Sequence, residues 1–342
     1  MDMRENSMKK LTAISIIFIL ILLTLFAVAF SIVLPRVVKT DSVNFKISTE
    51  IDALHNGDAK FYKDCIITNV GGVLKVYDKD GKNRKTYHDV AVNWLDCLDE
   101  EGIIVYGNGN NELGIAKLDD DYNLVSNDVI MKTENLQIDP TITKVGKKYY
   151  ITATEIEGTI NNPDPEQENG TYTIHLYQSS NLKEWSLVSD IVSAQNNLED
   201  VDVFYKDGHF YVTYEKETVD KGDSAIELAV SEDKDGKKFF KPKQLLESDC
   251  DHEPAAVVAY KKGYRLYYSC DKNDCGQSYQ GAQAFYADYD TSWNLKKKDQ
   301  LLHTETKKGI LLYDVDKHSQ TTKLLYTRNY LTDSDCIVEK AR

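Results

Sequence analysis

Residues 203–215 read VFYKDGHFYVTYE, which is an apolar strand, a turn at Asp207-Gly208 and an aromatic strand. The same pattern recurs in ITKVGKKYYITATE at 142–155 and in VVAYKKGYRLYYS at 257–269. Short alternating runs rich in Tyr, Val, Ile and Thr, separated by turn residues, are typical of antiparallel hairpins. The repeated hairpin therefore predicts an all-β fold built from similar units.

Several hairpins continue into a third and a fourth strand, at 172–188, 225–242 and 282–297. Four-strand units with a period of roughly 45 to 60 residues indicate the blades of a β-propeller. Full units begin near Asp96, Asp139, Asp202 and Glu253, and partial units remain at 58–88 and 309–342. A composite blade with strands from both chain ends would close the ring and remove open sheet edges. Four full units and one composite blade give five blades, with six as the alternative. A two-sheet sandwich fits less well, because it does not explain near-equal units.

A separate apolar segment precedes this domain. Residues 11–34 read LTAISIIFILILLTLFAVAFSIVL, without a charged side chain, and about 20 such residues can cross a bilayer as a helix. We expect a signal anchor, with a signal peptide cleaved after Ala29 as the alternative. Three Lys or Arg residues precede the segment and two follow it, which favours a cytoplasmic N-terminus and an extracellular bulk domain. The expected organisation is a tail (1–10), one span (11–34), a stalk (35–57) and the propeller (58–342).

The charge of the chain limits its partners. The whole chain carries −14, and the 36 basic and 53 acidic residues beyond position 40 give −17. Such a surface repels nucleic acid and anionic lipid. We therefore expect no nucleic-acid partner, and a neutral carbohydrate is easier to accommodate. We also expect no cofactor and no metal.

Six cysteines occur in the chain, and none forms a CxxC pair, which argues against a zinc knuckle. An even number outside the membrane permits disulfides, but the sequence does not fix their pairing. A bond between Cys65 and Cys336 across the composite blade is one candidate, and a local loop closed by Cys270 and Cys275 is another. Buried free thiols are the alternative.

Acidic residues stand where the innermost strands begin, and in a propeller these strand ends converge on the axis. The four residues are Asp96, Asp139, Asp202 and Glu253. Clustered carboxylates resist simultaneous ionisation, so one keeps its proton as an acid while another stays ionised as a base. Glycoside cleavage uses such a pair, and inverting enzymes hold the two groups roughly 6.5 to 9.5 Å apart.

The chain resembles the five-bladed propeller glycosidases of family 43, of the arabinanase and xylosidase type. The resemblance covers about 94–302 and rests on Asp139-Pro140 before GKKYYITAT, on SSNLKEWSLV (179–188), on SEDKDGKKFFKP (231–242) and on Glu253-Pro254 before GYRLYYS. The acid motif reads His-Glu-Pro here, where the family has Glu-Gly-Pro.

The resemblance implies a role for each acidic residue. Glu253 would be the general acid, Asp202 the group that tunes its pKa and Asp96 the base, two blades before Asp202. Asp200 competes with Asp202 for the second role. The residues expected to contact substrate are Asp139, His252 and Trp94.

Two functions fit these observations. The first is a membrane-anchored, extracellular glycoside hydrolase that uses two carboxylates in an inverting mechanism. The second is a non-catalytic propeller that binds a glycan or a protein at the cell surface. Hydrolysis that depends on Asp96 and Glu253 would separate the first from the second.

Overall fold

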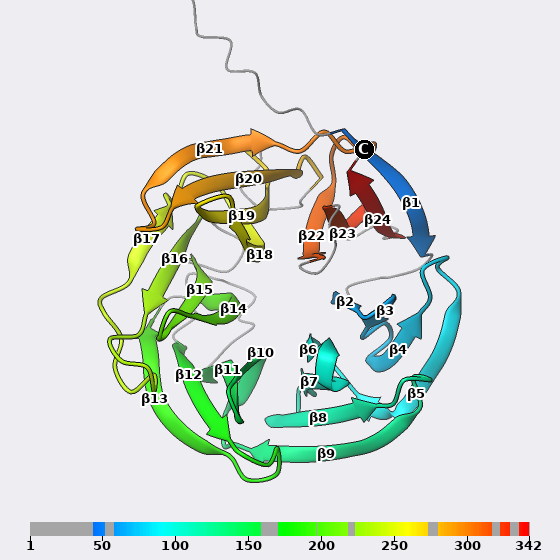
Figure 1. The fold of residues 1–342 in the computed structure, drawn as a ribbon, viewed down its shortest axis with the longest axis vertical. Coiled ribbons are helices and arrows are strands. Elements are labelled where there is room, and N and C mark those ends of the chain that lie inside the picture. The colour runs from blue at the N-terminus through cyan, green and yellow to red at the C-terminus, as the bar shows by residue number, and fades with distance from the viewer. Residues whose placement is uncertain are drawn as a thin grey trace, which may run out of the picture. The chain divides into compact units, whose positions relative to one another are not determined.

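The computed structural model describes residues 44–51, 58–158, 170–195, 197–217, 223–272, 280–316, 322–328 and 335–341. These residues form a β-propeller of six blades, each a four-stranded antiparallel sheet (Figure 1). The predicted all-β propeller is confirmed. The preferred count of five blades is wrong, and the alternative of six is right.

The predicted tail and membrane span, 1–10 and 11–34, lie outside the described residues. Within the described ranges the one helix is a 3-10 turn, η1 (Asp99–Glu101), so no helix there has the length and hydrophobicity to span a bilayer.

The strands follow the chain from blade to blade, with the innermost strand first in each. Blade 1 contains β2 (Ala59–Tyr62), β3 (Cys65–Thr68), β4 (Val73–Tyr77) and β5 (Asn83–Ala91). Blade 2 contains β6 (Trp94–Leu98), β7 (Ile103–Gly107), β8 (Glu112–Leu118) and β9 (Leu124–Lys132). Blade 3 contains β10 (Leu136–Val145), β11 (Lys148–Glu157), β12 (Thr171–Ser179) and β13 (Ser186–Ala194).

The second half of the ring repeats this order. Blade 4 contains β14 (Leu198–Lys206), β15 (His209–Glu217), β16 (Ser224–Val230) and β17 (Lys243–Leu246). Blade 5 contains β18 (His252–Tyr260), β19 (Gly263–Cys270), β20 (Gln283–Asp290) and β21 (Leu295–Leu301). Blade 6 contains β22 (Ile310–Val315), β23 (Lys323–Arg328), β24 (Asp335–Ala341) and, as its outermost strand, β1 (Phe45–Ile51).

Blade 6 closes the ring with strands from both ends of the domain. Strand β1 pairs antiparallel with β24, from Phe45 opposite Ala341 to Ile51 opposite Cys336. This confirms a composite blade but corrects the predicted stalk, because β1 lies inside 35–57. Residues 58–88, predicted as part of a shared blade, instead belong to a complete blade formed by β2 to β5, and this adds the sixth.

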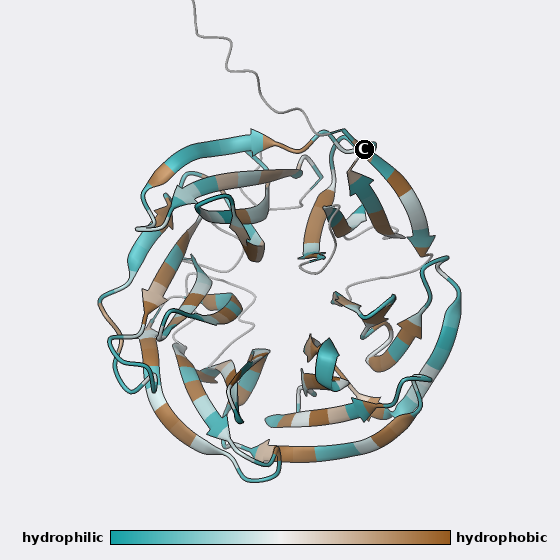
Figure 2. Ribbon diagram, viewed as in Figure 1, coloured by the Kyte–Doolittle hydropathy of each residue, from teal (hydrophilic) through white to brown (hydrophobic). Residues whose placement is uncertain are grey.

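The middle strands carry the core. All eight residues of β19 are buried, whereas the outer strand β21 is exposed or half-buried along its length. Hydrophobic and hydrophilic residues alternate along most strands (Figure 2), so apolar side chains can enter the interfaces between blades. In blade 5, for example, the rings of Tyr264 and Trp293 stack with their centroids 4.1 Å apart.

One contact recurs at all six junctions between neighbouring blades. A side chain near the axis accepts the backbone N–H of an inner strand in the next blade, and in five of the six cases it is an aspartate. The pairs are Asp58 with Leu95 (3.2 Å), Asp96 with Ile142 (2.9 Å), Asp139 with Asp200 (2.9 Å), Asp202 with Val257 (3.3 Å), Ser269 with Leu312 (2.8 Å) and Asp314 with Phe61 (2.9 Å). The acidic residues near the axis therefore join the blades as well as supplying candidate chemical groups.

Candidate active site

Lys60 on β2 marks the axis of the propeller. Burial of its ammonium group alone would lower its pKa, but Asp58, Asp314, Asp96 and Asp202 surround it and raise the pKa above its ordinary value. These carboxylates come from blades 1, 6, 2 and 4, so groups from opposite sides of the ring meet near one cation. Asp96 and Asp202 therefore both lie within electrostatic reach of the Lys60 ammonium group.

A second group of carboxylates, which we call the acid triad, consists of Asp200, Glu215 and Glu253. One carboxylate oxygen from each lies within 4.8 Å of the other two. Glu215 is 3% exposed, and its Oε1 atom has no hydrogen-bond partner among the described residues. Burial, followed by the charge of Glu253, raises the pKa of Glu215 well above its usual value. Glu215 therefore holds its proton to a higher pH than an ordinary glutamate does.

Glu215 breaks a pattern that the other blades follow. In blades 3, 5 and 6, the pairing of the inner strand with the second strand has a break in register. The first inner-strand residue after the break pairs with a residue of the second strand, and two positions further along the second strand there is a buried hydroxyl. These hydroxyl residues are Thr154, Ser269 and Thr327. The same count in blade 4 gives Glu215. Blade 4 thus places a carboxylate where its neighbours place a small polar group.

Two backbone irregularities set the direction of Asp139 and Asp200. Both residues lie at breaks in strand register and have left-handed backbone angles, with φ of 47° and 49°. Aspartate tolerates this conformation better than most residues, and bulges of this kind re-aim side chains beside active sites. Burial, followed by the charge of Asp200, raises the pKa of Asp139 to about 8. Asp139 is therefore mostly protonated at neutral pH, which makes it a poor base.

The two remaining predicted contact residues lie elsewhere. His252 is 0% exposed, and its Nδ1 atom is 2.9 Å from the carbonyl oxygen of Ser224, so it cannot present its ring to a substrate in this structure. Trp94 is half-buried and packs against the core shared by blades 3 and 4. The Trp94 ring also lies close to Gly107, because a Cβ atom added to that glycine would be only 3.2 Å from the ring. Both residues thus have packing roles in this structure, and contact of either with a substrate stays a prediction.

The cysteines also differ from the predicted pairing. Cys250 and Cys270 form a disulfide, whereas Cys65 and Cys97 are free thiols. The Cys65–Cys336 pair is therefore wrong, because Cys65 is a free thiol. Cys275, the predicted partner of Cys270, lies outside the described residues.

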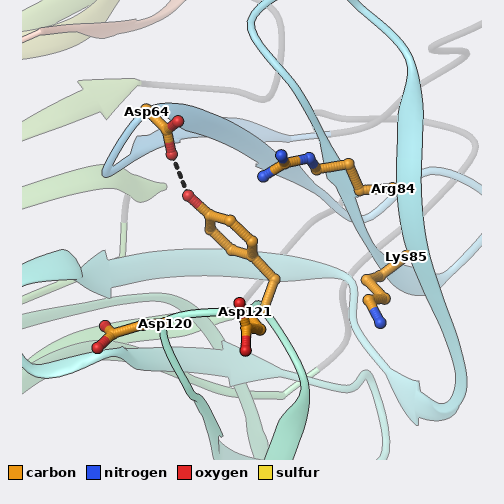
Figure 3. A pocket seen from close by; sticks show the side chains of 6 residues that line it. Asp64, Arg84, Lys85, Asp120 and Asp121 are labelled. Carbon is orange, nitrogen blue, oxygen red and sulfur yellow. Dashed lines mark hydrogen bonds between the residues drawn. The ribbon is translucent and has the colours of Figure 1, made fainter.

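A pocket of about 500 Å³ lies away from the axial groups. Figure 3 shows Arg84 and Lys85 of β5 on one side of it and acidic side chains on the other. It is formed at the β2–β3 and β8–β9 turns, and neither the acid triad nor the acids around Lys60 line it. Two of its three acids are already engaged, since Asp64 accepts a hydrogen bond from Tyr122 and Asp120 pairs with Lys63. The axis therefore remains the candidate site.

Sequence reasoning missed several members of this site. It found Asp96, Asp139, Asp200, Asp202 and Glu253 from their place at strand starts. It missed the axial residues Lys60, Asp58, Asp314 and Glu215. Asp58 carried the same signal as the others, because it stands directly before the inner strand β2. Glu215 gave no such signal, since it lies on a second strand.

Together these features define a six-bladed propeller with a carboxylate-rich axis. The family model of the glycosyl hydrolases of family 43 matches residues 125–253. That stretch contains blades 3 and 4 and ends at Glu253, so it includes Asp139 and the whole acid triad. The chain therefore carries a propeller that resembles family 43.

The fold has a counterpart among solved structures. An α-L-arabinofuranosidase from Fusarium graminearum, solved with an iminosugar inhibitor, is 12% identical, with a TM-score of 0.53 over 88% of this chain and 98% of its own. An exo-1,5-α-L-arabinanase from a bovine ruminal metagenomic library is 12% identical, with a TM-score of 0.48 over 86% of this chain and 94% of its own. No curated protein matches the chain. At these identities the likeness concerns the fold alone.

The raised pKa of Asp139 predicts a pH-dependent gain in stability for Asp139→Asn. In the folded chain Asp139 retains a proton up to a pH of about 8, whereas in the unfolded chain it releases the proton above a pKa of about 4. The free energy of unfolding of the wild type is therefore unaffected by Asp139 below pH 4 and falls as the pH rises towards 8. Asparagine is neutral and can still accept the N–H of Asp200. Thermal unfolding should therefore show a gain on the order of 3 kcal/mol at pH 8 and a much smaller one at pH 5.

Asp128→Asn is the matched control, because Asp128 is an exposed residue on the outer strand β9. It should change stability equally little at both pH values. An equal effect of Asp139→Asn at pH 5 and pH 8 would contradict a buried proton at Asp139.

Proposed function

We propose that this chain is a glycoside hydrolase that acts at the axis of its propeller. The observation that carries the proposal is the acid triad, which gathers three carboxylates from two blades beside the acidic ring around Lys60. The family match over the same residues supports it. We further propose that residues 11–34 anchor the chain in the cell membrane, with the propeller outside the cell.

In this proposal Glu253 donates a proton to the leaving oxygen of the glycoside. Asp200 and Glu215 hold that proton within the triad, because three carboxylates so close together cannot all be ionised. Asp200 takes the role first expected for Asp202, since Asp200 belongs to the triad and Asp202 lies near Lys60 and holds the N–H of Val257.

Asp96 is the proposed base that activates water. Its Oδ2 atom accepts the N–H of Ile142, which fixes the carboxylate, and the nearby ammonium of Lys60 favours its ionised form. Asp139 is the weaker candidate because it is mostly protonated at neutral pH. Blades 2 and 5 lie opposite each other in the ring of six, and a base and an acid from opposite blades would leave room for the water that an inverting mechanism requires.

A hydrolysis screen tests the proposal. The soluble fragment 43–342 is incubated with α-L-arabinosides, β-xylosides and β-mannosides, beside the variants Glu253→Gln and Asp96→Asn. We expect hydrolysis of at least one substrate class, its loss in both variants, and inversion of the anomeric centre in the NMR spectrum of the first product. Hydrolysis that survives both substitutions refutes the assigned residues. Binding without hydrolysis across the panel favours a non-catalytic glycan-binding propeller.

A further inference from the structure

A buried cluster of two sulfurs and one imidazole lies at the start of β18 and the end of β19. Its members are Cys250, His252 and Cys270, which are 1%, 0% and 1% exposed. The two Sγ atoms and a ring nitrogen of His252 all lie within 4.8 Å of one another. In this structure the two sulfurs form a disulfide. The cluster contributes nothing to the proposed hydrolysis.

The imidazole of His252 is held in a fixed orientation. Its Nδ1 atom is 2.9 Å from the carbonyl oxygen of Ser224, so Nδ1 carries the proton and donates it. The hydroxyl oxygen of Ser224 also accepts the backbone N–H of His252 at 2.6 Å. Because Nδ1 carries the proton, Nε2 carries the lone pair that can bind a metal. The Nε2 atom lies 3.5 Å from Sγ of Cys250 and 3.4 Å from a carboxylate oxygen of Asp249. Metal-binding histidines commonly donate their second N–H to a carbonyl in this way.

The two separations from Nε2 agree with tetrahedral zinc. Bonds of about 2.3 Å to sulfur, 2.05 Å to nitrogen and 2.1 Å to oxygen, at tetrahedral angles, separate nitrogen from sulfur by about 3.6 Å and nitrogen from oxygen by about 3.4 Å. The structure has 3.5 and 3.4 Å for these two separations. Two thiolates on the same ion would lie about 3.8 Å apart, so the disulfide must open before the metal can bind.

We propose that Cys250, Cys270 and His252 bind one Zn²⁺ ion when the Cys250–Cys270 disulfide is reduced, and that the exposed carboxylate of Asp249, 3.4 Å from Nε2 of His252, turns towards the ion as the fourth ligand. A dithiol reductant supplies two electrons and two protons, which convert the disulfide into two thiols while the reductant becomes a disulfide. Zn²⁺ then displaces the two thiol protons and binds both thiolates. The two sulfurs are thus either bonded to each other or bound to zinc, and the redox state of Cys250 and Cys270 determines which of the two forms is present.

The ligand types at this site favour zinc, and the exposed side chain of Asp249 connects the site with solvent. Thiolate and imidazole ligands select zinc over calcium or magnesium. The side chain of Asp249 is 48% exposed, so the fourth ligand connects the buried sulfurs with solvent. The other carboxylate oxygen of Asp249 lies 2.9 Å from Nζ of Lys298, which holds the ligand in place. The site departs from the expectation that the chain binds no metal.

The test uses the full-length chain with Cys65, Cys97, Cys275 and Cys336 replaced by serine, so that only Cys250 and Cys270 can supply thiolates. The protein is reduced, freed of reductant under argon and titrated with Co²⁺ and then Zn²⁺. We expect one equivalent of Co²⁺ with thiolate-to-metal absorption, full displacement by Zn²⁺, and no such absorption in the oxidised protein. Binding of less than half an equivalent by the reduced, folded protein would overturn the proposal.

Two substitutions identify the other ligands. Asp249→Asn should weaken Zn²⁺ binding at least tenfold, and because this side chain is half-exposed the variant should fold. Glu247→Gln, on the same exposed segment, is the matched control and should change the affinity less than twofold. His252→Asn should weaken binding further where it folds. Equal affinities for Asp249→Asn and Glu247→Gln would remove Asp249 from the site.

Discussion

Glu253→Gln is expected to lower kcat about 10³-fold on the best natural substrate while KM changes little. The glutamine keeps the shape of the side chain but has no proton to donate, and general acid catalysis contributes roughly 10² to 10⁴ in rate. The loss should shrink on a dinitrophenyl glycoside, whose leaving group departs without protonation. Steady-state rates on both substrates measure the difference.

Two variants serve as controls for this result. Asp96→Asn removes the proposed base, so it should be equally slow on both substrates. Glu215→Gln mimics the protonated carboxyl that burial favours and should keep activity within about tenfold. If Glu215→Gln were slow on the natural substrate but close to wild-type activity on the dinitrophenyl glycoside, the general acid would be Glu215 and not Glu253.

The propeller could be read from the sequence because each blade repeats one hairpin pattern with a turn residue at a fixed place. The blade count could not, because two segments gave weak signals. Strands β2 and β3 have four residues each, too short for alternation to stand out. Strand β1 follows the apolar segment and pairs with β24 nearly 300 residues later, a contact that local pattern does not encode.

The same limit applies to the site. Strand starts pointed to the axis, because propeller geometry brings them together whatever their sequence separation. Which acids contact one another depends on the bulges at Asp139 and Asp200, where backbone direction changes within two residues. The importance of Glu215 depends on its neighbours across a blade interface, and these are visible only in three dimensions.

Removal of β1 is expected to abolish the stable propeller. A chain that begins at residue 53 lacks the outermost strand of blade 6, which leaves β24 with an unpaired edge. It also removes the buried side chains of Phe45 and Ile51. Each of these is worth about 1.5 to 3 kcal/mol of burial. Together with the lost strand pairing, the deficit is comparable to the whole stability of a typical domain, about 5 to 15 kcal/mol.

A chain that begins at residue 43 is the matched control, because it keeps β1 and removes only the preceding residues. We expect this control to be monomeric by size-exclusion chromatography and to unfold in one cooperative transition. The chain from residue 53 should aggregate or melt without cooperativity, because the other five blades can close a ring only through blade 6. Equal melting temperatures for the two chains would mean that β24 alone completes the ring and that β1 is dispensable.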